Sequence, residues 1–174
     1  MLMGTVKRAT RARAAAIHKS KRRTRDPLLD LTVQYATTAR GAPSEEDFCE
    51  WAGSALAHDA RITVRLVGLA EGRTLNRTWR GKDYATNVLT FVLNDSPPYA
   101  GDLALCAPVV AREAREQGKN LAAHYAHLTV HGVLHLQGYD HENTRAAKTM
   151  EALESRILKR LGYPDPYGPL SHHG

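Results

Sequence analysis

HGVLHLQGYDH, at residues 131–141, combines a helical histidine pair with a glycine and a third histidine. His131 and His135 are four residues apart, so they lie on one face of a helix, about 6 Å apart along its axis. Gly138 tolerates positive φ and lets the chain turn sharply at the end of that helix. The turn returns His141 towards the pair, and the sequence therefore predicts that the three imidazoles meet.

Three imidazoles at this spacing indicate a metal site. Zinc binds histidine nitrogen at roughly 2.0–2.1 Å, and three protein ligands leave its fourth position open, which is typical of catalytic zinc. We therefore expect one Zn²⁺ at His131, His135 and His141, although nickel or another divalent ion also suits imidazole ligands. The alternative is a set of ordinary core or surface histidines, which is the interpretation we favour for His124 and His127 on the same helix.

The same spacing occurs in the metzincin proteases, whose pattern is HExxHxxGxxH. The glutamate after their first histidine is the general base of peptide hydrolysis, and here that position is Gly132. Glycine has no side chain that can take a proton. A metzincin-like metalloprotease is therefore the least favoured function for this site.

Around this segment, periodicity and turn residues predict an α+β fold, with strands mostly first and helices mostly last. Ser44, followed by three acidic residues, is expected to cap the first helix. The other helix boundaries are set by proline, glycine and apolar spacing. The expected strands are 28–35, 61–67, 86–93 and 101–106, and the expected helices are 44–58, 69–79, 108–117, 120–137 and 144–161.

Length and composition fit one soluble domain: the chain has 174 residues, 43% of them hydrophobic and 24% charged. It contains no apolar run of the roughly 20 residues that span a bilayer, and no secretory h-region. The two cysteines form no CxxC pair, which favours a reducing compartment. We expect no membrane association.

The positive charge is concentrated at the N-terminus, where residues 1–25 hold nine of the 24 basic residues and no acid. The rest of the chain has 15 basic and 18 acidic residues, so its net charge is slightly negative. Such blocks are usually disordered and often contact nucleic acid. A solvated tail, an upstream start codon and a mitochondrial presequence are the alternatives. We expect a basic, disordered tail at 1–26 and a single hydrolase domain at 27–174.

Several segments resemble the YbeY-type rRNA maturation factors, and the resemblance extends over residues 28–167. The matching segments are LNRTWRGKD at 75–83, TNVLTF at 86–91, GDLA at 101–104, HGVLHLQGYDH at 131–141 and LGYPDPY at 161–167. The resemblance implies a small mixed sheet of four strands flanked by helices, with the metal site at the end of the HxxxH helix.

The resemblance also implies a single-strand-specific, zinc-dependent endoribonuclease of the bacterial cytoplasm. Its roles would be maturation of the 3′ end of 16S rRNA and ribosome quality control, with the small ribosomal subunit and ribosomal or assembly proteins as partners. The family's metal ligands correspond to His131, His135 and His141, and its functional arginine to Arg80. Without the resemblance, a surface ion pair with Asp83 would explain Arg80 equally well. The alternative function is a ribosome-assembly binding factor that is stabilised by its metal and has little turnover.

Overall fold

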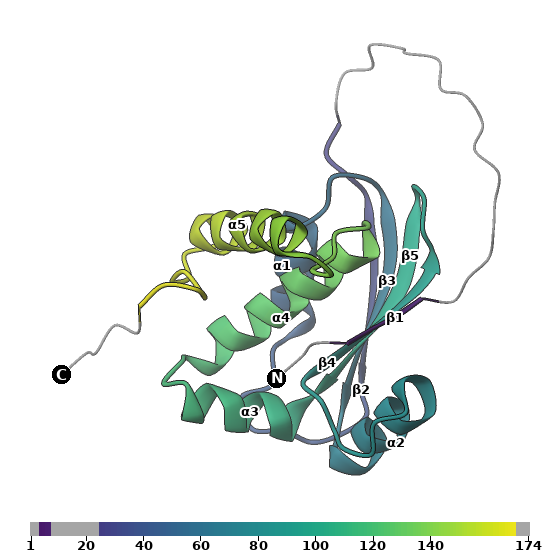
Figure 1. Ribbon diagram of the computed structural model, residues 1–174, viewed down its shortest axis with the longest axis vertical. Helices are drawn as coiled ribbons and strands as arrows, with labels where there is room; N and C mark the ends of the chain where they lie inside the picture. The colour runs from purple at the N-terminus through teal and green to yellow at the C-terminus, as the bar shows by residue number, and fades with distance from the viewer. Residues whose placement is uncertain (1–3, 8–24, 170–174) are drawn as a thin grey trace.

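The computed structural model describes residues 4–7 and 25–169, which form one mixed sheet with helices on both faces (Figure 1). Strand β4 is antiparallel to β5, and the other neighbouring strands are parallel. The predicted α+β class and mixed sheet are confirmed. The strands, in the spatial order β1-β4-β5-β3-β2, are β1 (Gly4–Lys7), β4 (Val88–Asn94), β5 (Tyr99–Cys106), β3 (Ala60–Val67) and β2 (Leu29–Tyr35).

All four predicted strands are present, but the sheet has a fifth strand, β1, that the sequence did not predict. β1 lies within the basic segment 1–26 that we expected to be disordered, and it extends the sheet edge by pairing Gly4 with Leu89. Edge pairing uses backbone donors and acceptors, which every sequence carries. The pattern of side chains therefore predicts such a strand poorly. Residues 1–3 and 8–24 of the same segment lie outside the described residues.

Four helices lie towards one side of the sheet and α2 lies across the opposite face (Figure 1). Helix α4 is central, because it packs against β4 and β5 and also against α1, α3 and α5. In the described ranges, no helix is long and apolar enough to cross a membrane. The helices are α1 (Glu45–Ser54), α2 (Leu69–Arg80), α3 (Ala107–Glu116), α4 (Leu121–Leu136) and α5 (Thr144–Arg160).

Helix α1 begins as predicted and ends earlier than predicted. Ser44 forms a capping box with Asp47, but the helix stops at Ser54 and does not continue to residue 58. The Gln137 side chain donates to the Ala55 carbonyl at 2.6 Å and accepts from the Ala57 amide at 2.8 Å. These bonds satisfy backbone groups that follow α1, and they come from a residue that is 80 positions from Ala57 in the sequence.

The sequence also suggests Thr144 as the cap of the last helix, but the structure places the N-cap of α5 one residue earlier, at Asn143. The Asn143 side chain accepts from the Ala146 amide at 2.9 Å. Both residue types cap helices well, so the sequence alone does not separate them.

Gly132 sets how closely α4 approaches the sheet. A Cβ at this position would lie 2.6 Å from Cδ2 of Leu103 on β5 and 3.3 Å from Oγ1 of Thr90 on β4. Residues 124–136 of α4 are all buried, so the helix cannot move outward without breaking contacts on its other sides. The absence of a side chain at residue 132 is therefore a packing requirement.

We expect Gly132→Ala to lower the free energy of unfolding by about 1–3 kcal/mol, because the added methyl overpacks the contact between α4 and β5. Urea denaturation measures the change. Gly53→Ala in α1 is the matched control, since a Cβ there meets nothing within 4 Å. Alanine at residue 53 should stabilise the protein by about 0.5–1 kcal/mol. If Gly132→Ala is as stable as wild type, the close approach does not constrain the fold.

Candidate metal centre

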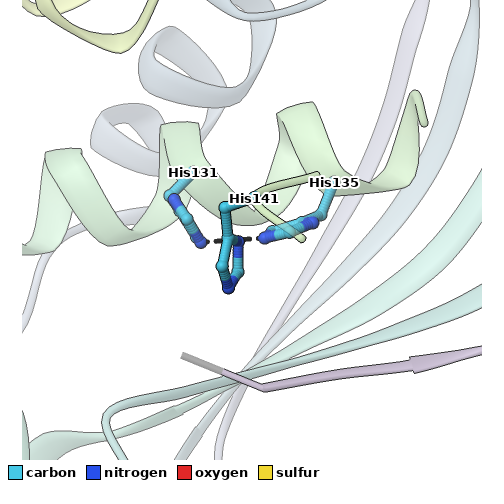
Figure 2. Close-up of side chains that lie close together, drawn as sticks. All are labelled: His131, His135 and His141. Atoms are coloured by element: carbon cyan, nitrogen blue, oxygen red, sulfur yellow. Dashed lines mark hydrogen bonds between the residues drawn. The ribbon is translucent and has the colours of Figure 1, made fainter. Parts of the chain in front are cut away.

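The structure brings together the three predicted histidines, His131, His135 and His141. His131 and His135 extend from the same side of α4, and His141 reaches them from the following turn (Figure 2). One ring nitrogen from each lies within 4.8 Å of the other two. The Nε2 atoms of His131 and His135 are 2.9 Å apart. Both helix histidines are buried, while His141 is partly exposed.

The turn between α4 and α5 places His141. Helix α4 ends at its C-cap Gln137, and Gly138 follows with φ +94°, a conformation that favours glycine. Oδ1 of Asp140 accepts from the Glu142 amide at 3.3 Å, which shapes the remainder of the turn. The predicted role of Gly138 is confirmed, and His141 lies between it and the cap of α5.

The donor set suits a divalent metal ion. In a tetrahedral site with bonds of 2.0–2.1 Å, ligand nitrogens are about 3.3 Å apart, close to the 2.9 Å between the two Nε2 atoms. Nδ1 of His141 is buried and has no hydrogen-bond partner. Burial, with the neighbouring His131 and His141, lowers the pKa of His135 to about 4, so this ring is neutral at physiological pH. Neutral imidazoles with free lone pairs are what a metal ion requires.

Behind His131, the carboxylate of Glu154 from α5 joins the candidate site to the C-terminal segment. Glu154 accepts hydrogen bonds from Nδ1 of His131 and the Tyr167 hydroxyl, and its Oε2 lies 3.4 Å from Nε2 of His127. Burial tends to raise the Glu154 pKa, but the bonds from His127 and His131 outweigh it and lower the pKa to about 2. His127, His131 and Glu154 form a second group whose ligand atoms lie within 4.8 Å of one another.

His124 lies further along α4, in a separate buried cluster. Its Nε2 is 2.9 Å from Oε2 of Glu113 on α3, and Nδ2 of Asn87 donates to the same carboxylate at 3.0 Å. Asn87 also uses its Oδ1 to accept from the Val88 amide at 2.6 Å. This cluster ties the start of β4 to α3 and α4. His124 is thus a core histidine with an acidic partner, in line with our expectation for it.

Arg80, the predicted functional arginine, is the last residue of α2 and is partly buried. Its guanidinium donates to Oδ1 of the buried Asn76 at 3.4 Å, and Asn76 donates in turn to the Tyr84 carbonyl at 2.7 Å. The alternative ion pair with Asp83 does not form, because Asp83 binds Arg73 at 2.8 Å and Arg77 at 3.7 Å. Within residues 4–7 and 25–169, no hydrogen bond joins Arg80 to the three histidines.

Sequence reasoning missed Glu154 and Tyr167, although one signal was available. The apolar stripe of α5 includes Met150 and Ile157, and Glu154 lies between them on the same face, four and three residues away. An acid on the buried face of a helix needs a partner, since an unpaired buried charge is costly. The histidines of α4 were the available partners.

The Glu113 cluster predicts a specific dependence of stability on pH. Burial raises the Glu113 pKa, but hydrogen bonds from His124 and Asn87 outweigh burial and lower it below the ordinary 4.5. A lowered folded-state pKa stabilises the protein above the unfolded-state pKa, and this contribution disappears as the pH falls through the folded-state value. We therefore expect Glu113→Gln to be less stable than wild type at neutral pH, with a difference that shrinks below pH 4.5.

Urea unfolding across this pH range measures the effect, and Glu116→Gln serves as the control because Glu116 is an exposed acid on the same helix. The control should differ little from wild type at every pH. A difference for Glu113→Gln that stays constant with pH would contradict the assignment.

Comparison with known proteins supplies the family. The family model described as Endoribonuclease YbeY matches residues 44–162. A protein of that name from Nitrosomonas eutropha is 57% identical over 137 residues, covering 79% of this chain and 97% of its own length. Another from Aromatoleum aromaticum is 62% identical over 142 residues, covering 80% of this chain and 92% of its own. The chain therefore belongs to the YbeY family.

Proposed function

We propose that this protein is a metal-dependent endoribonuclease that cleaves single-stranded RNA, with His131, His135 and His141 holding one Zn²⁺. The observation that carries the proposal is the convergence of these three histidines in a chain whose relatives are named Endoribonuclease YbeY. The three-imidazole set favours zinc, and nickel is the nearest chemical alternative.

The proposed substrate is ribosomal RNA at the 3′ end of 16S rRNA, with a further role in ribosome quality control. The resemblance of residues 28–167 to the rRNA maturation factors supports this substrate. The proposed setting is the bacterial cytoplasm, where the protein would meet the small ribosomal subunit and its assembly proteins. The basic residues of 1–25 would add a sequence-independent attraction to RNA.

A bound zinc ion supplies a Lewis acid that polarises a phosphoryl oxygen and lowers the pKa of water to about 7. The chain itself would contribute the three imidazoles, held by α4 and the Gly138 turn. Arg80 would grip a phosphate oxygen and offset the negative charge that develops during cleavage, because guanidinium binds phosphate in a bidentate manner and stays charged.

Peptide hydrolysis is disfavoured by the same geometry. A metzincin places its general base at the position of Gly132, and here Leu103 and Thr90 fill the space that a side chain would need. A proton acceptor at this position would require at least the Leu103 side chain to move. The binding-factor alternative predicts a metal without turnover, and the experiment below distinguishes it from the nuclease.

We expect wild-type protein to bind about one equivalent of zinc and cleave single-stranded RNA, and His135→Ala to lose both, because two imidazoles bind zinc much more weakly than three. Elemental analysis and a cleavage assay on the same samples measure this. His58→Ala, an exposed histidine remote in sequence, is the control and should keep both. Cleavage that persists in a metal-free, folded His135→Ala would refute the catalytic role, while zinc binding without cleavage in wild type would favour the binding factor.

For Arg80→Ala we expect unchanged zinc content and stability with RNA cleavage about 100-fold slower or worse, as when a donor to developing negative charge is removed. Arg77→Ala is the matched control, since Arg77 lies on the same helix but faces Asp83. Loss of zinc in Arg80→Ala would show that its role lies in the metal site. If the two variants slow RNA cleavage equally, Arg80 contributes only a general electrostatic attraction to RNA.

A further inference from the structure

Glu154 is the most deeply buried acid near the three histidines, with a relative exposure of 0%. Its two oxygens have separate tasks. Oε1 faces Nδ1 of His131, and Oε2 faces both Nε2 of His127 and the Tyr167 hydroxyl. Every neighbour in this set can donate a hydrogen, so all of them fit an ionised carboxylate, which only accepts.

The contact between Glu154 and His131 fixes which ring nitrogen of His131 carries the hydrogen. A carboxylate oxygen accepts, so Nδ1 of His131 must donate, and in a neutral ring the lone pair is then at Nε2. Nε2 is the atom that lies 2.9 Å from Nε2 of His135. Glu154 thus selects the His131 tautomer whose free nitrogen points to the centre of the three histidines.

The segment after α5 holds Glu154 from the other side. Oδ1 of Asp165 accepts from the Ser155 hydroxyl at 2.7 Å and from the Tyr167 amide at 3.0 Å. These bonds fold residues 165–167 back towards α5 and bring the Tyr167 hydroxyl to Glu154. The same hydroxyl lies 3.2 Å from Nε2 of His127. The C-terminal segment is thereby connected to His131 through one carboxylate.

We propose that Glu154 is the positioning residue of the metal centre: it orients His131 and sets its tautomer for metal binding, and Tyr167 holds Glu154 in place. This inference rests on the proposed metal-binding role of the three histidines. It assigns Glu154 no contact with RNA or with the ion. Carboxylates that accept from a ligating imidazole typically contribute 10- to 100-fold to metal affinity.

The test compares Glu154→Gln with Glu151→Gln, measuring zinc affinity by competition with a chromophoric chelator. Both variants replace an acid of α5 by its amide, but Glu151 is exposed. An amide offers only one accepting group, so it cannot serve all three donors of the Glu154 site. We expect zinc affinity to fall about 10- to 100-fold in Glu154→Gln and to stay within about twofold in Glu151→Gln.

Two further measurements keep the inference testable if Glu154→Gln folds poorly. Tyr167→Phe removes one hydroxyl from a side chain that is 44% exposed, and we expect it to weaken zinc binding by a smaller factor than Glu154→Gln does. Long-range ¹H–¹⁵N NMR of zinc-free wild type should show His131 with its hydrogen on Nδ1. This measurement is made on the wild-type protein, so it does not require any variant to fold.

Three outcomes would overturn the inference: a folded Glu154→Gln with wild-type affinity, a His131 hydrogen on Nε2 in zinc-free wild type, or a second zinc equivalent that disappears in Glu154→Gln. The last would make Glu154 a ligand in the group with His127 and His131. Failure of the proposed function would differ from all three, because wild type and Glu151→Gln would then bind zinc as weakly as His135→Ala.

Discussion

Helix α4 packs so closely on the sheet that side chains of the sheet occupy the space that a Cβ at residue 132 would need. Leu103 and Thr90 lie against this point, so the helix is rotated with Gly132 towards the sheet. Since side chains on a helix are spaced by about 100°, this rotation also decides where His131 and His135 point. The close packing of α4 on the sheet and the orientation of the candidate ligands are therefore linked through residue 132.

The buried histidines of α4 impose a second constraint, which acids from two other helices meet. Glu113 from α3 faces His124, and Glu154 from α5 faces His127 and His131. Burying a carboxylate that faces imidazoles contributes little net stability, because its desolvation offsets most of what the hydrogen bonds gain. Removing one partner is costly, however, so these pairs tie α3 and α5 to α4 in one arrangement. Their effect is to position the histidine rings more than to stabilise the fold.

Local signals explain what the sequence could predict. The convergence of His131, His135 and His141 follows from the helix repeat and from one glycine with positive φ, and both are properties of neighbouring residues. The strands were found because Ile62, Val64 and Leu66 alternate with polar residues, and these three are buried as expected. Such features need no knowledge of the rest of the chain.

Three unpredicted features depend on partners distant in sequence. Helix α1 ends at Ser54, and Gln137 binds the backbone of Ala55 and Ala57 just beyond it. β1 exists because β4 offers an unpaired edge. Glu154 is separated from His131 by 23 residues, and neither spacing nor propensity connects them. Its place on the apolar stripe of α5 indicates a buried partner without identifying it.

The charges of α2 bear directly on the choice between nuclease and protease. Arg73 and Arg77 both face Asp83, so one carboxylate offsets part of their two positive charges. Arg80, at the end of the same helix, donates to the neutral Asn76 and forms no ion pair among the residues the structure describes. A partly buried cation without a counterion favours an anionic ligand. A phosphodiester offers that negative charge before and during cleavage, whereas a peptide bond is neutral in the ground state. The charge of Arg80 is therefore compatible with the anionic substrate that we propose, and a peptide substrate would not need it.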